Sequence, residues 1–248
     1  IKTTSNNELG QLESAFDHMA QSLYKTQELR KSMIVNVAHE LRTPLTNIQG
    51  YFEAFKDEVL PPSKQHLESM HEETLRLTKL AEDLLLLARA DTAESNLKQQ
   101  LINIDTLVET ALQLFWHQFS ARNISVEIAN WPENRQVSMD PAKMMQVLSN
   151  LFQNVIRYTP EGGKVRIWCT KTAKSLTVSI ANSGEGIPQQ DLPFIFERFF
   201  RSEKSRSRDH GGAGIGLAIV KELIVAHGGE VGATSSATET RIWFSLPI

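Results

Sequence analysis

Apolar residues recur at alternating steps of three and four over the first part of the chain, which predicts a long helix with one narrow apolar seam. Pro44 falls within this helix and is expected to kink it, because proline lacks the backbone N–H that a helix uses. The seam consists of Leu9, Leu12, Phe16, Met19, Leu23, Met33, Val37 and Leu41.

A second helix of the same kind follows Pro61 and Pro62, which are expected to reverse the chain direction. Two helices joined by a turn supply only half of a core. We therefore expect two copies of the chain to pair as a homodimeric four-helix bundle. The second seam consists of Leu67, Met70, Thr74, Leu77, Ala81, Leu84 and Ala88.

The rest of the chain follows a different pattern and predicts an α+β domain with a mostly antiparallel sheet under helices. A polar stretch over residues 91–100 indicates a linker, and helices are expected at 104–121, 141–158 and 214–227. The segment 198–216 is rich in glycine, serine and basic residues, which predicts a mobile loop. Three strand faces are indicated by Val165, Ile167, Cys169, Leu176, Val178, Ile180, Ile242, Phe244 and Leu246.

Composition narrows the class of protein. Hydrophobic residues make up 41% and charged residues 22% of the 248 residues, and the net charge is −3, which is typical of a soluble globular chain and disfavours a basic nucleic-acid binder. Cys169 is the single cysteine, so a reducing compartment is expected. The apolar runs are far shorter than the roughly 18 residues of a membrane span, and we expect no membrane contact by this segment.

His39 and Glu40 form the first candidate for chemistry. His39 lies off the seam, so its imidazole is expected to face solvent, with Thr43 one turn further on. An exposed imidazole beside a carboxylate is a usable nucleophile, because the acid can take one ring proton while the other nitrogen attacks. On this pair alone, a merely solvated surface histidine is the more common interpretation.

A second candidate is the face formed by Asn150, Asn154 and Arg157, which are spaced i, i+4 and i+7 on a predicted helix. Amide oxygens suit Mg²⁺, and a guanidinium can hold phosphate oxygens. An ordinary polar helix face explains the same spacing equally well.

Glycines supply the third candidate, in residues 182–188 after a strand and in residues 211–217 before a helix. The second run can place backbone N–H groups and the positive end of a helix against phosphates. The spacings of a P-loop and of a Rossmann motif are not met.

Together these segments resemble the cytoplasmic core of a bacterial two-component sensor histidine kinase, over nearly the whole chain. The matching segments are His39-Glu40-Leu41-Arg42-Thr43-Pro44 (H box), 150–158 (N box), 182–186 (G1 box), 195–199 (F box) and 212–216 (G2 box). Residues 6–23 are similar to the last helix of a HAMP signal relay.

The resemblance implies a helical-hairpin dimerisation domain followed by an α/β-sandwich ATP-binding domain of the histidine kinase, gyrase and chaperone ATPase superfamily. It also implies that the fragment is cytoplasmic and that its parent protein sits in the bacterial inner membrane. The expected boundaries are 1–24 for the HAMP-like helix, 25–92 for dimerisation and phosphotransfer, 93–101 for the linker and 102–248 for ATP binding.

The resemblance further implies that His39 accepts the γ-phosphoryl group of ATP, that Glu40 is its base, and that a response-regulator aspartate then receives the phosphate. Thr43 would orient a water for dephosphorylating that regulator. Asn154 would coordinate Mg²⁺ and Asn150 would support it. The other expected nucleotide contacts are Arg157, Tyr158, Asn182, Gly184, Gly186, Ile187, Phe196, Phe199, Gly212, Gly214, Gly216, Leu217 and Thr240.

Three positions depart from the family pattern. Asn182 replaces an aspartate that accepts a hydrogen bond from the adenine amino group, so adenine recognition is expected to persist with lower affinity. Arg157 replaces a lysine and keeps the charge. Thr240 lacks the glycine that normally accompanies it.

Rival functions remain open at this point. Hydrolytic relatives in the superfamily carry a glutamate where this chain has Asn150, which cannot act as a general base, so transfer to His39 is favoured over hydrolysis. A catalytically degenerate relay and an enzyme that is mainly a regulator phosphatase are the alternatives. The other histidines, His227 among them, have no ligand-type partner at useful spacing, and no metal site or special role is expected for them.

Overall fold

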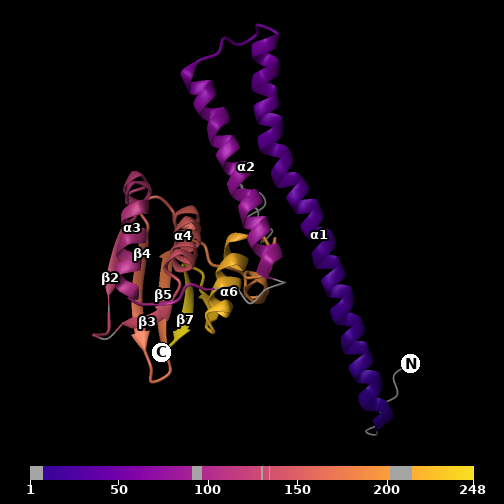
Figure 1. The fold of residues 1–248 in the computed structure, drawn as a ribbon, viewed down its shortest axis with the longest axis vertical. Helices are drawn as coiled ribbons and strands as arrows, with labels where there is room; N and C mark the ends of the chain where they lie inside the picture. The colour runs from indigo at the N-terminus through magenta and orange to yellow at the C-terminus, as the bar shows by residue number, and fades with distance from the viewer. Residues whose placement is uncertain (1–7, 91–96, 130, 134, 202–213) are drawn as a thin grey trace. The chain divides into compact units, whose positions relative to one another are not determined.

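The structure is a computed structural model, and it describes residues 8–90, 97–129, 131–133, 135–201 and 214–248 (Figure 1). The chain divides into two compact units, Ile1–Thr74 and Leu75–Ile248. We call them the hairpin unit and the α/β unit. None of the described helices combines the length and the hydropathy that crossing a bilayer requires.

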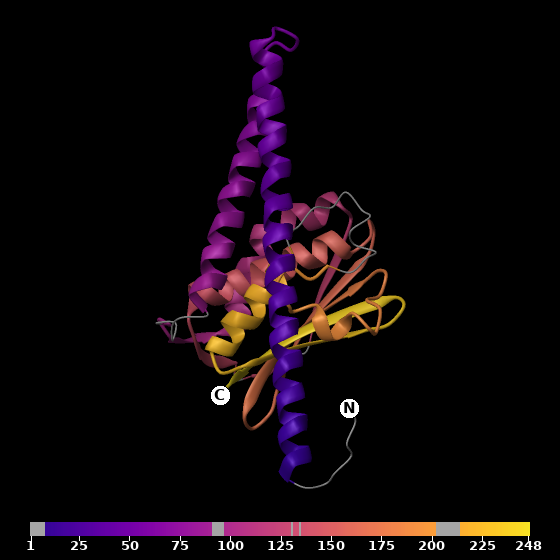
Figure 2. The same cartoon turned by 90° about the vertical axis from the view of Figure 1, so that its right-hand side faces the viewer.

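Two helices joined by residues 57–63 build the hairpin (Figure 2). Helix α1 spans Glu8–Lys56 and continues through Pro44, and helix α2 spans Lys64–Ala90 and passes from the hairpin unit into the α/β unit. Between them Glu58 adopts a left-handed backbone (φ 56°), which ends α1 before the two prolines. The predicted reversal at Pro61 and Pro62 is confirmed.

Contacts between α1 and the start of α2 hold the tip of the hairpin together. Asn47 Nδ2 donates a hydrogen bond of 2.9 Å to Glu73 Oε1. The His66 ring lies 5.6 Å from the Tyr51 ring and 5.9 Å from the Phe55 ring, centroid to centroid. The side of α1 that contacts α2 therefore continues well beyond Leu41, the last residue of the predicted seam.

The buried face of α2 differs in part from its predicted seam. Met70 is buried as expected, but Leu67 is 57% exposed and Thr74 and Ala81 are also exposed. Leu80 and Leu87 are buried instead, each one residue before a predicted seam position. Helix α2 therefore has two neighbouring apolar sides. The side with Leu80 and Leu87 is buried, whereas much of the predicted seam is exposed in a single chain.

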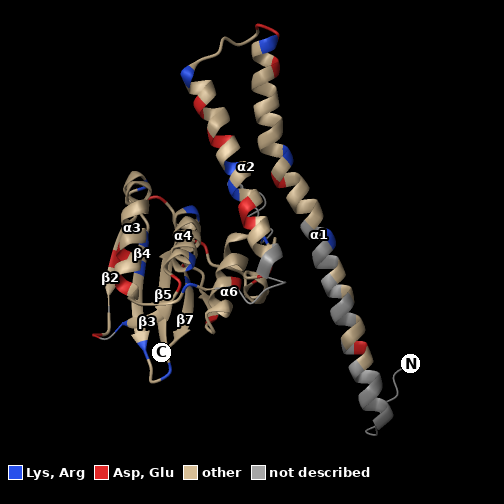
Figure 3. Ribbon diagram, in the orientation of Figure 1, with Lys and Arg blue, Asp and Glu red and all other residues tan. Residues whose placement is uncertain are grey.

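Charged residues of both signs follow one another along α2 (Figure 3). One of them, Lys64, forms an ion pair of 3.5 Å with Glu68 one turn later. Both side chains are largely solvated, so this pair adds little to stability.

The α/β unit contains a five-stranded sheet in the order β2-β4-β5-β7-β6 and a two-stranded antiparallel sheet of β1 and β3. Strand β2 runs parallel to β4, and the other neighbours in the large sheet are antiparallel. The strands are β1 Gln100–Asn103, β2 Ser125–Ala129, β3 Gln136–Met139, β4 Lys164–Lys171, β5 Ser175–Ser183, β6 Glu230–Ser235 and β7 Glu239–Pro247.

Three helices cover one face of this sheet: α3 (Ile104–Ala121), α4 (Pro141–Tyr158) and α6 (Gly216–Ala226) (Figure 1). A short 3-10 helix, η1, spans Leu192–Phe194. The strand residues predicted to face a core are buried on β4, β5 and β7, and the rings of Phe115 and Phe119 meet that of Phe152 edge to face. The α+β prediction is therefore confirmed. Gln100 and Leu101, the end of the predicted linker, belong to β1.

Candidate functional site

His39 lies on the exposed side of α1, so solvent reaches its imidazole, as its position off the seam predicts. Glu40 is half-buried beside it. The Thr43 hydroxyl donates a hydrogen bond of 3.3 Å to the main-chain oxygen of His39. These three residues of the hairpin unit therefore lie on one turn of helix, with an accessible nucleophile at its centre.

Helix α4 begins where the sequence places a strong start signal. Asp140 caps it, because Oδ1 accepts hydrogen bonds from the N–H groups of Ala142 (3.0 Å) and Lys143 (3.2 Å). Pro141 occupies the first helical position, where no N–H is required. The apolar side of α4 packs into the core through Met144, Val147, Leu148, Leu151, Phe152 and Val155.

Asn150 and Asn154 stand one turn apart on α4. Asn150 is only 6% exposed, and its Nδ2 has no hydrogen-bond partner among the described residues. Asn154 is half-buried, and Arg157 and Tyr158 are exposed in the last turn. A buried amide donor left without an acceptor costs about 1–3 kcal/mol, so the Asn150 amide is suited to a bound polar group.

The N-terminus of α6 lies against this amide. A Cβ placed on Gly216, the first residue of α6, would be 3.8 Å from Asn150 Cγ. Ile215 precedes it and gives the helix no side-chain cap. The N–H groups of the first turn and the positive end of α6 are thus available to an anion beside Asn150.

A second cluster spans β5, β7 and β6. Asn182 is paired in register with Thr240, and Thr240 with Ser235. The hydroxyls of Thr240 and Ser235 are 2.8 Å apart, and Ser235 Oγ accepts a hydrogen bond of 2.8 Å from the Ile187 N–H. Asn182 Nδ2 donates to the Ser183 oxygen (3.1 Å). The buried Asn182 thereby keeps its Oδ1 as an acceptor.

The loop after β5 needs glycine where it passes the turn between β6 and β7. The N–H groups of Gly184 and Gly186 donate to the main-chain oxygens of Thr238 (3.0 Å) and Ala237 (3.4 Å). A Cβ on Gly186 would lie 1.6 Å from the Ser236 oxygen, which is a clash with backbone. This loop is therefore held tightly across the end of the sheet.

A close contact between two left-handed residues joins the segment after η1 to the start of α6. Phe199 is buried with φ 63°, and its N–H donates a hydrogen bond of 2.9 Å to the oxygen of Gly214, which has φ 67°. Phe196, shortly before Phe199, and Leu217, shortly after Gly214, are half-buried. Gly212, a predicted nucleotide contact, lies outside the described residues.

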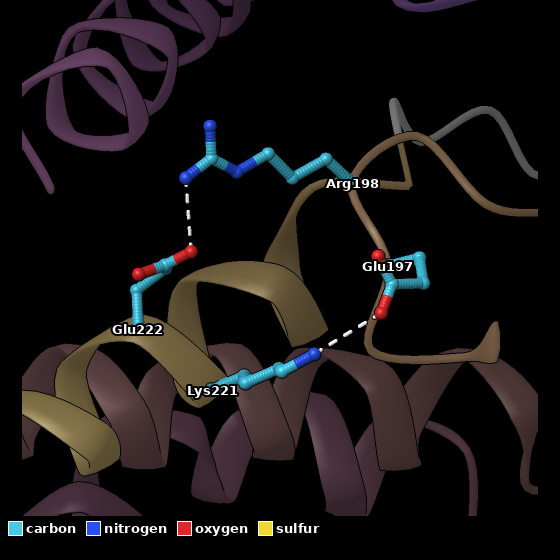
Figure 4. Close-up of polar contacts among 4 residues, drawn as sticks. All are labelled: Glu197, Arg198, Lys221 and Glu222. Atoms are coloured by element: carbon cyan, nitrogen blue, oxygen red, sulfur yellow. Dashed lines mark hydrogen bonds and ion pairs between the residues drawn. The ribbon is translucent and has the colours of Figure 1, made fainter. Parts of the chain in front are cut away.

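Two ion pairs of opposite polarity fasten the same segment to α6 (Figure 4). Lys221 Nζ lies 3.1 Å from Glu197 Oε1, and Arg198 lies 2.9 Å from Glu222 Oε1. A shift of one residue would set like charges opposite each other, so the pattern of charges favours the observed pairing of the two segments. We call these four residues the charge quartet.

Comparison with known proteins identifies two domains in the chain. Residues 29–93 match the family described as "His Kinase A (phospho-acceptor) domain", and residues 139–248 match "Histidine kinase-, DNA gyrase B-, and HSP90-like ATPase". The signal transduction histidine-protein kinase BaeS of Escherichia coli (strain K12) is 34% identical over 236 residues, covering 95% of this chain and 50% of BaeS. The chain carries the phospho-acceptor and ATPase domains of a histidine kinase, and its relatives are sensor histidine kinases.

Other relatives agree with these two matches. The sensor histidine kinase WalK of Bacillus subtilis (strain 168) is 35% identical over 230 residues, or 90% of this chain and 37% of WalK. The structure of the Acinetobacter baumannii histidine kinase AdeS aligns with a TM-score of 0.72 at 26% identity, covering 84% of this chain and 97% of that chain. The chain spans about half the length of the curated relatives BaeS and CusS that it matches.

Two places in the α/β unit have polar groups that suit a nucleotide, one for its phosphates and one for its base. Asn150 Nδ2, which is buried and has no partner among the described residues, and the uncapped start of α6 suit phosphates. The Oδ1 of Asn182 suits the amino group of a purine. Sequence reasoning found all three residues or segments. It missed Ser235 and the charge quartet, because their contacts join residues far apart in the chain.

Proposed function

We propose that this kinase transfers the γ-phosphoryl group of ATP to His39 and then passes it to an aspartate of a response-regulator receiver domain. One observation carries the proposal: an exposed histidine in a phospho-acceptor domain accompanies an ATPase-type site in which Asn150 replaces the water-activating glutamate of hydrolytic relatives. An amide cannot act as a general base, so His39 rather than water is the nucleophile.

The transfer step involves two residues of the hairpin unit directly. An imidazole nitrogen of His39 forms a bond to the γ-phosphorus as the bond to the bridging oxygen breaks, with ADP as the leaving group. The carboxylate of Glu40 accepts the proton of the other ring nitrogen. Bound Mg²⁺ would neutralise charge on the phosphates, held by the amide oxygen of Asn154 with support from Asn150.

Nucleotide binding is assigned to residues of the α/β unit. Asn182 Oδ1 accepts a hydrogen bond from the adenine amino group, with Thr240 opposite it. The start of α6 and Asn150 receive the phosphates. The remaining proposed contacts are Arg157, Tyr158, Gly184, Gly186, Ile187, Phe196, Phe199, Gly212, Gly214, Gly216 and Leu217.

The kinase is proposed to act as a homodimer through its hairpin. Leu45 and Phe52 stand seven residues apart on α1 and are 54% and 60% exposed, and Leu67 on α2 is 57% exposed. A second hairpin that covered this stripe would complete a four-helix bundle. Light scattering tests it: Phe52→Lys should shift the mass from dimer to monomer, whereas Gln49→Lys, on an exposed polar position, should not.

A receiver domain is the proposed partner. The histidine kinase ThkA in complex with response regulator protein TrrA aligns with this chain at a TM-score of 0.70 and 27% identity, covering 91% of this chain and 66% of ThkA. Thr43 is exposed and close to His39, so we also propose that its hydroxyl orients a water that dephosphorylates the regulator.

The proposal extends to the organisation of the parent protein. We place a HAMP-like helix at 1–24, the phosphotransfer domain at 25–92, a linker at 93–101 and the ATP-binding domain at 102–248. The parent protein would hold this part on the cytoplasmic side of the bacterial inner membrane.

Incubation with ATP labelled at the γ-phosphate tests the proposed function. The chain should take up label in the presence of Mg²⁺, His39→Gln should take up none, and Asn154→Ala should take up far less. His66→Gln, a change at another histidine of the hairpin, should label normally. Consumption of ATP without labelling would indicate a hydrolase, and neither labelling nor consumption would indicate a degenerate relay.

A further inference from the structure

His227 is buried at the end of α6, 5% exposed, and both of its ring nitrogens have partners. The Asp140 N–H donates a hydrogen bond of 3.0 Å to His227 Nε2. Nδ1 lies 2.7 Å from the main-chain oxygen of Leu223. Because a backbone N–H can only donate, Nε2 must carry a lone pair, and Nδ1 therefore carries the proton that it donates to Leu223.

Asp140 joins this histidine to two other segments of the α/β unit. Its Oδ1 holds the first turn of α4, as described above. Its Oδ2 accepts a hydrogen bond of 2.9 Å from the N–H of Lys98, which lies between the end of α2 and β1. One residue thus bonds to the start of α4, the end of α6 and the backbone between α2 and β1.

Helices α4 and α6 run antiparallel and contact each other at two places. Asp140 at the start of α4 contacts His227 at the end of α6, and Asn150 in the middle of α4 lies against Gly216 at the start of α6. At a rise of ~1.5 Å per residue, the stretch from Asp140 to Asn150 is about 15 Å long and that from Gly216 to His227 about 17 Å. Because the two arms are nearly equal and stiff, a shift at the His227 end moves Gly216 relative to Asn150 by a similar distance.

We propose that His227 is a positioning residue for the phosphate end of the nucleotide site. By accepting the Asp140 N–H it sets the register of α6 against α4, and so it places the α6 N-terminus beside Asn150. Through the Lys98 N–H, the same junction connects that register to the chain segment leading from α2. This inference rests on the proposed function, because it assumes that the site binds ATP.

Nucleotide binding to three forms of the full chain tests it: wild type, His227→Leu and His227→Gln. A glutamine side chain has an amide oxygen to accept the Asp140 N–H and an amide N–H to donate to Leu223, so it can replace both bonds of the imidazole. Leucine leaves the buried Asp140 N–H without an acceptor. The affinity for MgATP should fall about tenfold in His227→Leu, while the affinity for adenosine stays within about twofold, and His227→Gln should retain most of the MgATP affinity.

The ratio of the two affinities separates positioning from stability. An equal loss of MgATP and adenosine binding in His227→Leu would make the residue merely structural, and unchanged MgATP binding, or no rescue by glutamine, would also overturn the inference. Failure of the wild-type chain to bind MgATP would instead overturn the proposed function.

Nitrogen NMR of the wild-type chain gives a readout that needs no variant. The His227 Nε2 resonance should show the neutral form with the proton on Nδ1, and it should shift when MgATP binds but not when adenosine binds. The same shift with both ligands, or with neither, would contradict the inference.

Lys98→Pro, which removes the N–H bonded to Asp140, should lower MgATP affinity, and Lys98→Ala, which keeps it, should not.

Discussion

The side-chain amide of Asn182 is oriented by its neighbour, because Nδ2 donates a hydrogen bond of 3.1 Å to the main-chain oxygen of Ser183. Its Oδ1 is left to accept a bond from a ligand, and the side chain is buried at the end of β5. The expectation that an amide can replace the usual carboxylate in adenine recognition thus gains a structural basis.

Asn182→Asp should raise MgATP affinity. A charged acceptor forms a hydrogen bond about twice as strong as a neutral one, which predicts a gain of about threefold to tenfold after the loss of the bond to Ser183. Calorimetric titration measures it. Asn103→Asp, which adds the same charge before α3, should leave the affinity unchanged, and an equal or lower affinity for Asn182→Asp would disprove this account of Asn182.

Reversing one charge of the quartet should weaken the α/β unit, and reversing its partner as well should restore it. Glu197→Lys sets two ammonium groups opposite each other and should cost about 1 kcal/mol in the free energy of unfolding, an upper value for pairs as exposed as these. Adding Lys221→Glu should recover most of that loss. Urea unfolding of the two single variants and the double variant provides the test.

The exposed Lys64–Glu68 pair on α2 is the matched control for the quartet. Its single charge reversals should change stability by only a few tenths of a kcal/mol. If the Glu197→Lys and Lys221→Glu effects simply add, the two side chains do not interact and the charge pattern does not favour the observed pairing.

Gly214→Ala should lower both stability and MgATP affinity. Gly214 has φ 67°, and an added Cβ would lie 2.7 Å from the Phe200 oxygen, so alanine is expected to cost more than about 1 kcal/mol. Gly50→Ala in α1 is the control, because nothing lies within 4 Å and alanine favours helix, for a gain of about 0.5–1 kcal/mol. Thermal unfolding of both variants checks the opposite signs.

Asp140 should make the α/β unit sensitive to acid. Burial alone would raise its pKa, but the N–H groups of Lys98, Lys143 and Ala142, with the charge of Lys143, hold the pKa below its ordinary value of 3.8. A lowered folded-state pKa means that this stabilisation is present above the ordinary value and is lost as the pH falls through the folded-state pKa.

Asp140→Asn should therefore lower stability at neutral pH and flatten the acid limb of the stability–pH curve. Its amide can accept with only one oxygen, and its NH₂ group would face one of the backbone donors. Urea unfolding over a pH series measures the effect. Parallel curves for wild type and variant through the acid range would show that Asp140 does not cause the acid sensitivity.

Local signals predicted much of the fold. Helices α3 and α4 begin and end at the residues that the apolar pattern indicated. An N-cap such as Asp140 and a wide apolar stripe can both be recognised from residues that lie close together in the sequence. The buried faces of β4, β5 and β7 followed from alternation. Strands β1, β2, β3 and β6 and the sheet order were not predicted, because short strands become recognisable only through distant pairing partners.

The candidate site was predicted to a similar extent. His39, Asn150 and the glycine segments followed from motifs, and the structure brings Asn150 to Gly216 and Asn182 to Thr240. No special role was expected for His227. Its ring accepts a hydrogen bond from the main-chain N–H of Asp140, and no sequence pattern indicates a main-chain donor so distant in the chain. The residues that α2 buries were predicted only in part, because they depend on which elements pack against α2, and the spacing of its own apolar residues does not indicate those elements.

Tandem mass spectrometry after incubation with MgATP, under neutral to alkaline conditions that preserve phosphohistidine, shows which residue of the chain receives the phosphoryl group. We expect a phosphoryl group on His39, stable in base, labile in acid and absent from His39→Gln. A phosphoryl group on another residue such as His66, or hydrolysis of ATP with His39 unmodified, would contradict this expectation.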